Sequence, residues 1–360
     1  MLPRLSLENL FYELIRISIG KAESLSRNPL EREWEALFEI SQKQAVSGIA
    51  FIALEKLGNS GVKLPQNLLF EWISLSEQIK AKNEFLNKRC REITRIFLDA
   101  GFESCILKGQ GNAMMYPVIG SRMPGDIDIL VLGERKEITK FVKDRCPNAF
   151  EQYHHIDFPV FNDTVVEVHY SPGALFIPKY NQRFQQWCTA QEETACRYDE
   201  TLGFRVPYTE FNAVHQMVHI MNHFFVEGIG LRHFIDYYYV MQKCHEEGTD
   251  IAGIRDKFRH FGLEKFARGV MWIEQHCLGL DDSMLIIEPS EKVGKLILKE
   301  MEEGGNFGHY DKRYAIRKKG MLARGIADSY RLMQLATVFP SESFWKILHK
   351  IENQKWKIKR

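Results

Sequence analysis

The sequence predicts an α+β protein in which a small mixed β-sheet lies between two helical regions. Two changes in the spacing of apolar residues predict this, because helical spacing gives way to short apolar runs near residue 101 and returns near residue 206. The chain of 360 residues is also longer than a single hydrophobic core usually organises. We therefore expect three parts, at residues 1–100, 101–205 and 206–360.

The first part is predicted to be a layer of helices. Apolar residues recur three and four positions apart from Leu5 onward, as on the buried face of a helix. The pattern breaks at Gly20, at Asn28-Pro29 and in segment 58–65, where glycine, proline and asparagine end helices.

The middle part holds short apolar runs bounded by turn residues, which predict strands. The four runs are 102–107, 127–132, 156–161 and 165–170. The polar turn at 162–164 predicts that the last two strands form an antiparallel hairpin. Segments 110–116 and 134–145 are predicted helices that pack on the sheet.

Helical spacing returns at Thr209 and continues to Pro340. Segment 344–360 alternates bulky and basic residues, which fits an amphipathic helix or a frayed end. Residues 310–360 carry 13 Lys or Arg against 4 Asp or Glu, although the whole chain has 48 basic and 47 acidic residues. The nearly neutral charge of the whole chain excludes a protein that binds nucleic acid over most of its surface. Contact with a polyanion, such as RNA or an acidic membrane, is expected only at 312–319 and 346–360. These two segments also fit a simple solvated face.

The cysteines and the apolar runs indicate a soluble cytoplasmic protein. The seven cysteines are scattered and never form a Cys-x-x-Cys pair, so neither a disulfide framework nor a zinc ribbon is expected. Charged residues interrupt the first 20 positions, unlike a signal peptide, and no later run reaches the length of a transmembrane segment.

Two carboxylates stand side by side at the start of the predicted strand at 127–132. Residues i and i+2 of a strand point to the same face, so Asp126 and Asp128 present neighbouring acids. Such acids repel one another unless a cation lies near them, and hard cations such as Mg²⁺ prefer oxygen ligands. A lone Asp-x-Asp is also common at strand ends without any metal.

A third acid, Glu167, alternates with Val166 and Val168 in an otherwise apolar strand, where burial is costly without a partner. If that strand lies beside the strand of Asp128, the three carboxylates converge and can hold two metal ions, as in phosphoryl transfer.

Lys108, Gly109 and Arg122 are predicted contacts for phosphate. Gly109 lets the backbone approach a phosphate closely, and Lys108 or Arg122 can neutralise a triphosphate. The simpler alternatives are that Lys108 is a solvated residue at a strand end and that Arg122 pairs with an aspartate.

Together these motifs resemble the uncharacterised nucleotidyltransferase family of the polymerase-beta-like superfamily. The motifs are Leu107-Lys108-Gly109, Tyr116-Pro117, Arg122, Asp126-Ile127-Asp128-Ile129-Leu130-Val131 and Glu167-Val168-His169, with similar flanking helices at 34–37 and 231–236. The resemblance implies a nucleotidyltransferase core with a two-metal site, in which Asp126 and Asp128 bind Mg²⁺ or Mn²⁺ and Glu167 completes the site. It also implies that an NMP group passes from a nucleoside triphosphate to an acceptor (a small molecule, a protein or RNA) with release of pyrophosphate. Much of the superfamily has Gly-Gly or Gly-Ser where this chain has Gly109-Gln110, so no serine hydroxyl can contact the phosphate here.

A histidine ladder suggests a second enzyme class, a metal-dependent phosphohydrolase. His215, His219 and His223 lie four residues apart and would share one face of a helix. The ladder spans roughly 12 Å at 1.5 Å per residue, so the three side chains cannot bind one ion on a straight helix. Histidines that line the cleft or pack between helices are the simpler expectation.

Arg232 follows the loop Gly228-Ile229-Gly230 and could reach a phosphate, although its spacing from Asp236 also fits an ion pair within one helix. A third alternative is a nucleotide-binding protein without turnover, against which the three carboxylates argue.

Overall fold

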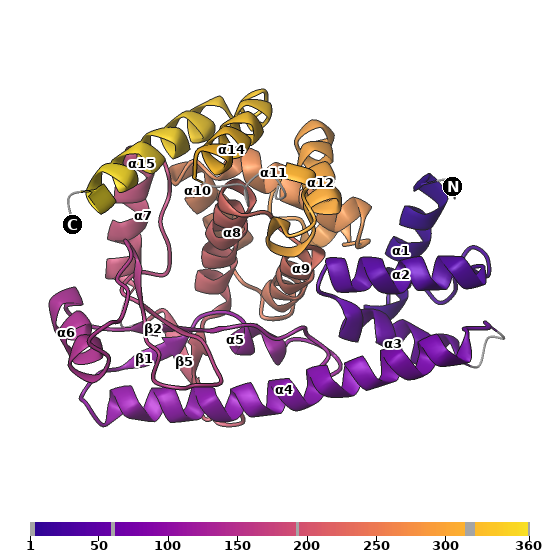
Figure 1. Ribbon diagram of the computed structural model, residues 1–360, viewed down its shortest axis with the longest axis horizontal. Helices are drawn as coiled ribbons and strands as arrows, with labels where there is room; N and C mark the ends of the chain where they lie inside the picture. Colours follow the sequence, from indigo (N-terminus) through magenta and orange to yellow (C-terminus); the bar gives the residue numbers. More distant parts are fainter. Residues whose placement is uncertain (1–3, 59–61, 192–193, 314–320, 359–360) are drawn as a thin grey trace.

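The computed structural model describes residues 4–58, 62–191, 194–313 and 321–358, and it has the predicted α+β architecture. A small sheet lies low in the molecule, between a long helix below it and a bundle of C-terminal helices above it (Figure 1). Of the basic segments, residues 314–320 and 359–360 lie outside the described residues. The described helices include none that is both long enough and apolar enough to cross a membrane.

The N-terminal part is helical, as predicted. Its helices are α1 (Arg4–Ser18), α2 (Glu31–Lys43), α3 (Ser47–Leu57) and α4 (Gln66–Leu98). The buried side chains of α4 form one stripe from Leu68 to Phe97, at steps of three and four residues apart from one longer gap. Because this stripe meets α3 near its start and the sheet near its end, α4 joins the first helices to the sheet (Figure 1).

Four short strands form a mixed sheet in the order β1-β2-β4-β3. The strands are β1 (Ser104–Ile106), β2 (Ile127–Val131), β3 (His155–Asp157) and β4 (Val166–His169). Strand β2 is parallel to β4, whereas β1 is antiparallel to β2 and β3 is antiparallel to β4. The expected hairpin between the last two strands is therefore confirmed. The two helices expected on the sheet are α5 (Gln110–Ala113), shorter than predicted, and α6 (Arg135–Arg145).

One face of this sheet is apolar and packs on α4 and α6. The strand residues on this face are Ile106, Ile127, Ile129, Val131, Ile156, Val166 and Val168. They share a buried cluster with Phe97 of α4 and Val142 of α6. Since successive strand residues point to opposite faces, the polar residues between them point away from α4.

A second hairpin was not predicted from the sequence. It consists of β5 (Cys196–Asp199) and β6 (Phe204–Pro207), with α7 (Pro178–Ala190) before it. Each of its strands is four residues long and carries an arginine, so neither contains the apolar run that indicates a strand.

The C-terminal part is helical to the end of the described chain. Its helices are α8 (Thr209–Val226), α9 (Leu231–Glu246), α10 (Ile251–His260), α11 (Glu264–His276), α12 (Glu291–Gly304), α14 (Met321–Ala336) and α15 (Pro340–Ile358), with short 3₁₀ turns at Asp282–Met284 and Asn306–Gly308. The segment after residue 344, in which bulky and basic residues alternate, therefore belongs to a helix, α15, as far as Ile358.

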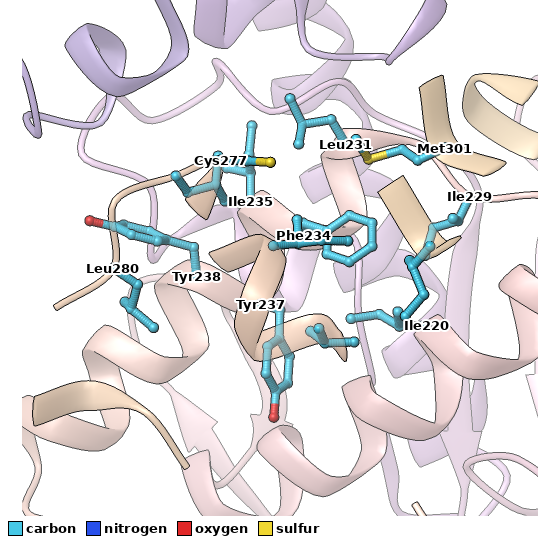
Figure 2. Packing of buried hydrophobic residues seen from close by; sticks show 14 of the residues in the cluster. Ile220, Ile229, Leu231, Phe234, Ile235, Tyr237, Tyr238, Cys277, Leu280 and Met301 are labelled. Carbon is cyan, nitrogen blue, oxygen red and sulfur yellow. The ribbon is translucent and has the colours of Figure 1, made fainter. Parts of the chain in front are cut away.

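The largest buried cluster joins the N-terminal and C-terminal helices. It contains Trp34 and Trp72 together with Phe234 of α9. Figure 2 shows Phe234, Tyr237 and Tyr238 projecting from α9 among apolar side chains of neighbouring elements. The two helical parts thus share one core, and α8 and α9 lie on the side of the molecule away from α4 (Figure 1).

Candidate functional site

The polar face of the sheet brings two of the three predicted carboxylates together. In the parallel register of β2 and β4, Asp128 lies directly opposite Glu167. Ligand atoms of these two residues and of His169 all lie within 4.8 Å of one another. His169 is on the same face as Glu167 because it follows two positions later in β4.

Asp128 is buried and has two positively charged neighbours. Its Oδ1 atom lies 3.0 Å from Nζ of Lys108 and 2.9 Å from Nε2 of His169. Burial by itself would raise the pKa of Asp128, but the Lys108 ammonium and His169 together lower it well below its usual value. Asp128 is therefore a carboxylate whose charge is balanced by side chains from outside its own strand.

Asp126 lies at the entrance of β2 rather than within it, because the strand begins at Ile127. The neighbouring charge of Asp128, followed by burial, raises the pKa of Asp126. In the described part of the chain, no group of three metal-ligand atoms as close as 4.8 Å includes Asp126. The structure thus places Asp126 next to the Asp128–Glu167 pair, without its carboxylate converging on that pair.

His169 forms the second positive neighbour of the carboxylates. Burial lowers its pKa, but the hydrogen bond with Asp128 and the contact with Glu167 raise it to about 8. The interaction with His169 also lowers the pKa of Glu167, against the effect of burial. Both opposed carboxylates are therefore ionised at neutral pH, with an imidazolium beside them.

Strand β3 adds two polar residues that the sequence analysis missed. Asp157 lies opposite Glu167 and His155 lies opposite His169. Ligand atoms of His155, Asp157 and Glu167 also lie within 4.8 Å of one another, so Glu167 belongs to two candidate ligand groups. Both ring nitrogens of His155 are buried without a hydrogen-bond partner. The signal for them was the alternation His155-Ile156-Asp157, which is obscured if the strand is taken to begin at residue 156.

Lys108 and Gly109 follow β1 and lie beside the carboxylates. The Lys108 ammonium lies 3.1 Å from Nδ1 of His219, which reaches down from α8. Gly109 has φ +59°, and a Cβ atom there would lie 3.5 Å from the carbonyl oxygen of Asp126. The positive φ favours glycine at this position, whereas the distance alone is an ordinary van der Waals contact that a Cβ atom could make.

Arg122 forms a buried ion pair instead of pointing into solvent. Its Nε and Nη2 atoms lie 2.7 Å and 2.8 Å from the two carboxylate oxygens of Asp236 on α9. The hydroxyl of Tyr116 donates a further hydrogen bond of 2.6 Å to Asp236. Asn83 of α4 donates to the carbonyl oxygen of Arg122 at 2.8 Å. Arg122 therefore anchors the loop before β2 to α9 and α4, which matches its simpler interpretation, and Asp236 does not pair with Arg232.

Arg232 is buried next to that loop but lacks a carboxylate partner among the described residues. Its Nη1 atom donates to the carbonyl oxygen of Met123 at 3.2 Å, and its Nε atom is buried without a partner. Burial, together with the positive charge of Arg122, lowers the pKa of Arg232 to about 10. Its Nη1 atom lies 3.6 Å from the position of a Cβ atom on Gly125, so the guanidinium borders the entrance of β2.

The histidine ladder of α8 does not act as one group of ligands. His215 is buried and its Nε2 atom lies 3.0 Å from the carbonyl oxygen of Pro172. His219 contacts Lys108, and His223 lies 3.4 Å from Glu227. A phosphohydrolase site built on all three therefore has no support from their positions.

One comparison with known proteins, the family-model match, agrees with these motifs. The family model described as uncharacterised nucleotidyltransferase matches residues 31–279, more than half of the chain. No curated protein matches the chain. Among solved structures, the chain is similar to an antigenic nucleotidyltransferase-like protein from Paracoccidioides brasiliensis, with 11% identity and a TM-score of 0.30 over 58% of this chain and 95% of that one. The residues matched by the family model include the whole sheet, and the chain belongs to this uncharacterised nucleotidyltransferase family.

Proposed function

We propose that this protein transfers the NMP group of a nucleoside triphosphate to an acceptor hydroxyl or similar group, in a reaction that requires Mg²⁺ or Mn²⁺ and releases pyrophosphate. The observation that carries the proposal is the position of Asp128 opposite Glu167 on adjacent parallel strands, in a chain of a nucleotidyltransferase family. Acceptors to be tested are small molecules, proteins and RNA.

The residues on the polar face fit a divalent cation. Asp128 and Glu167 are ionised and offer oxygen ligands, while Asp126 supplies a third carboxylate at the strand entrance. The charge now neutralised by Lys108 and His169 is the charge that a cation would neutralise. The neutral imidazole of His155, in one group with Glu167, suits Mn²⁺ better than Mg²⁺, which prefers oxygen alone. When bound, such a cation supplies charge for the triphosphate oxygens and lowers the pKa of an acceptor hydroxyl.

The protein side chains around the carboxylates have separate proposed roles. Lys108, which touches Asp128 at 3.0 Å, can pair with triphosphate oxygens once Asp128 has another counter-charge. Gly109 allows the backbone to approach the same phosphate. Arg232 has a guanidinium without an ion-pair partner in the described chain, and we assign it the second phosphate contact. Glu167 can accept the proton of the acceptor group.

Arg122 has a different proposed role, because Asp236 occupies two of its guanidinium nitrogens. We assign it to positioning: the ion pair fixes the loop that leads to Asp126. An Arg122→Lys protein should therefore lose activity through disorder at Asp126 rather than through loss of a phosphate contact.

The test is incubation with each labelled nucleoside triphosphate, Mg²⁺ or Mn²⁺ and pools of acceptors. Wild type should transfer label to one class of acceptor, and Asp128→Asn should lower the rate on the order of 100-fold or more, since a group that acts in the transition state is lost. Asp144→Asn, on the exposed side of α6, serves as the matched control and should keep full activity. Nucleotide binding without transfer in the wild type would support the silent binding protein instead.

A further inference from the structure

A second group of histidines lies above Lys108, outside the carboxylate site. His219 and His223 are one turn apart on α8, and His233 is in the first turn of α9. Ligand atoms of all three lie within 4.8 Å of one another. Their ring centroids are 4.2 Å (219 to 223), 4.9 Å (223 to 233) and 5.7 Å (219 to 233) apart. The sequence ladder concealed this group, because its third member comes from the next helix rather than from His215.

Oxygen atoms on the outer side of the group orient two of the rings. Nδ1 of His223 lies 3.4 Å from the carboxylate of Glu227, and Nδ1 of His233 lies 3.2 Å from the carbonyl oxygen of Gly230. An acceptor at Nδ1 keeps the proton there and leaves the lone pair of Nε2 free, which is how metal-binding histidines are usually oriented. Burial lowers the pKa of His219 and His233 well below the usual value, so both rings are neutral.

The backbone around the group is tightly packed. Phe307, at φ +55°, places its ring 5.3 Å from that of His223 and 6.0 Å from that of His233. A Cβ atom on Gly228 would lie 2.6 Å from the backbone nitrogen of Gly308, so the two loops meet where only glycine fits. The histidines are thus held by two helices and a fixed loop, as a preorganised site requires.

We propose that His219, His223 and His233 form a binding site for a transition-metal cation of the Zn²⁺ type, separate from the Asp128–Glu167 pair. Three imidazoles and one open position are a ligand set that zinc accepts, whereas Mg²⁺ prefers oxygen ligands. The open position is available to water or to an anionic oxygen of a bound molecule.

Lys108 links this site to the carboxylates. Its ammonium lies 3.1 Å from Nδ1 of His219 and 3.0 Å from Oδ1 of Asp128. A cation bound by His219 competes with the ammonium for the same ring and repels its charge, so Lys108 moves toward Asp128. Removing the ammonium therefore strengthens metal binding at the histidines.

The experiment titrates the full-length, EDTA-treated protein with Zn²⁺ by calorimetry and with Co²⁺ by visible absorption, in excess Mg²⁺. We expect one equivalent of Zn²⁺ and a tetrahedral Co²⁺ spectrum. His223→Gln, at a half-buried position, should weaken this binding by roughly 100-fold or more, beyond the loss typical of outer residues. His245→Gln, which alters an exposed histidine on α9, is the matched control and should change nothing. His233→Gln provides a second ligand variant, and far-ultraviolet circular dichroism checks that each variant is folded.

Further variants separate this site from the carboxylates. Asp128→Asn should retain the Zn²⁺ equivalent, and Lys108→Met should bind Zn²⁺ more tightly than wild type. Equal Zn²⁺ affinity in wild type and His223→Gln, absence of binding, or loss of the equivalent in Asp128→Asn would each overturn the assignment. Equal affinity in Lys108→Met would contradict the place of His219 in the site. None of these outcomes depends on nucleotidyl transfer.

Discussion

The two faces of the four-stranded sheet differ in chemistry although the same strands build both, because alternate residues of each strand point to opposite faces. The apolar face, formed by residues such as Ile129 and Val168, is closed by α4 and α6. The polar face, formed by Asp128, Glu167 and His169, is completed by Lys108 and by α8 above it. Burial of hydrocarbon stabilises the first face, whereas each buried charge on the second costs free energy unless a partner compensates it.

This difference separates stability from function. Changes on the apolar face should alter the folding free energy and leave the chemistry of correctly folded molecules intact. Changes on the polar face should alter chemistry and metal binding more than they alter folding, except where they leave a buried charge without its partner.

The largest expected effect on stability comes from leaving a buried charge without its partner, at the ion pair that anchors the loop before β2. Asp236→Ala removes the partner of buried Arg122, and breaking a buried ion pair from one side typically costs about 3–5 kcal/mol. Urea unfolding should show this loss. The double variant Arg122→Met with Asp236→Ala should recover part of it, because no uncompensated charge remains. A loss below about 1 kcal/mol in Asp236→Ala would show that the guanidinium finds solvent.

On the apolar face, Ile129→Ala should destabilise the protein by about 3 kcal/mol, since a fully buried side chain is replaced by a cavity. Its activity per folded molecule should equal that of wild type. An Ile129→Ala protein with normal stability and low activity would contradict the separation of roles between the two faces.

The sequence predicts the two faces unequally well. Short apolar runs located all four strands, and alternation placed Glu167 on the polar face. The sequence did not predict that β2 pairs with β4, because no local pattern indicates which strands are neighbours. The convergence of Asp128 and Glu167 was therefore predicted only on the assumption that their strands are adjacent. The ion pair of Arg122 joins residues 114 positions apart, and the α8–α9 histidine group depends on how two helices meet. Tertiary contacts of this kind leave no mark on periodicity.

A smaller effect concerns His169, whose pKa is raised from 6.5 in the unfolded chain to about 8 in the fold. The protonated imidazole therefore stabilises the metal-free protein, by about 2 kcal/mol, and this contribution is complete below pH 6.5 and is lost as the pH rises through 8. Histidines with lowered pKa, such as His154 and His155, act with the opposite sign, because they become protonated in the unfolded chain near pH 6.5. The contribution of His169 is therefore obtained by comparing wild type with His169→Gln.

Urea unfolding in EDTA at pH 6.5 and pH 8.5 measures this step. When the pH rises from 6.5 to 8.5, the free energy of unfolding of wild type should fall relative to that of His169→Gln, by roughly 1.5 kcal/mol. An equal difference in the variant would assign the titration to another group.

The central claim is that Asp128 and Glu167 hold one divalent cation together. A double-mutant cycle of Mn²⁺ affinity, with Asp128→Asn, Glu167→Gln and the double variant, tests it most directly by electron paramagnetic resonance. We predict that each single variant loses most of the binding and that the double variant loses little more. Losses that simply add, or unchanged affinity in either single variant, would contradict a shared site.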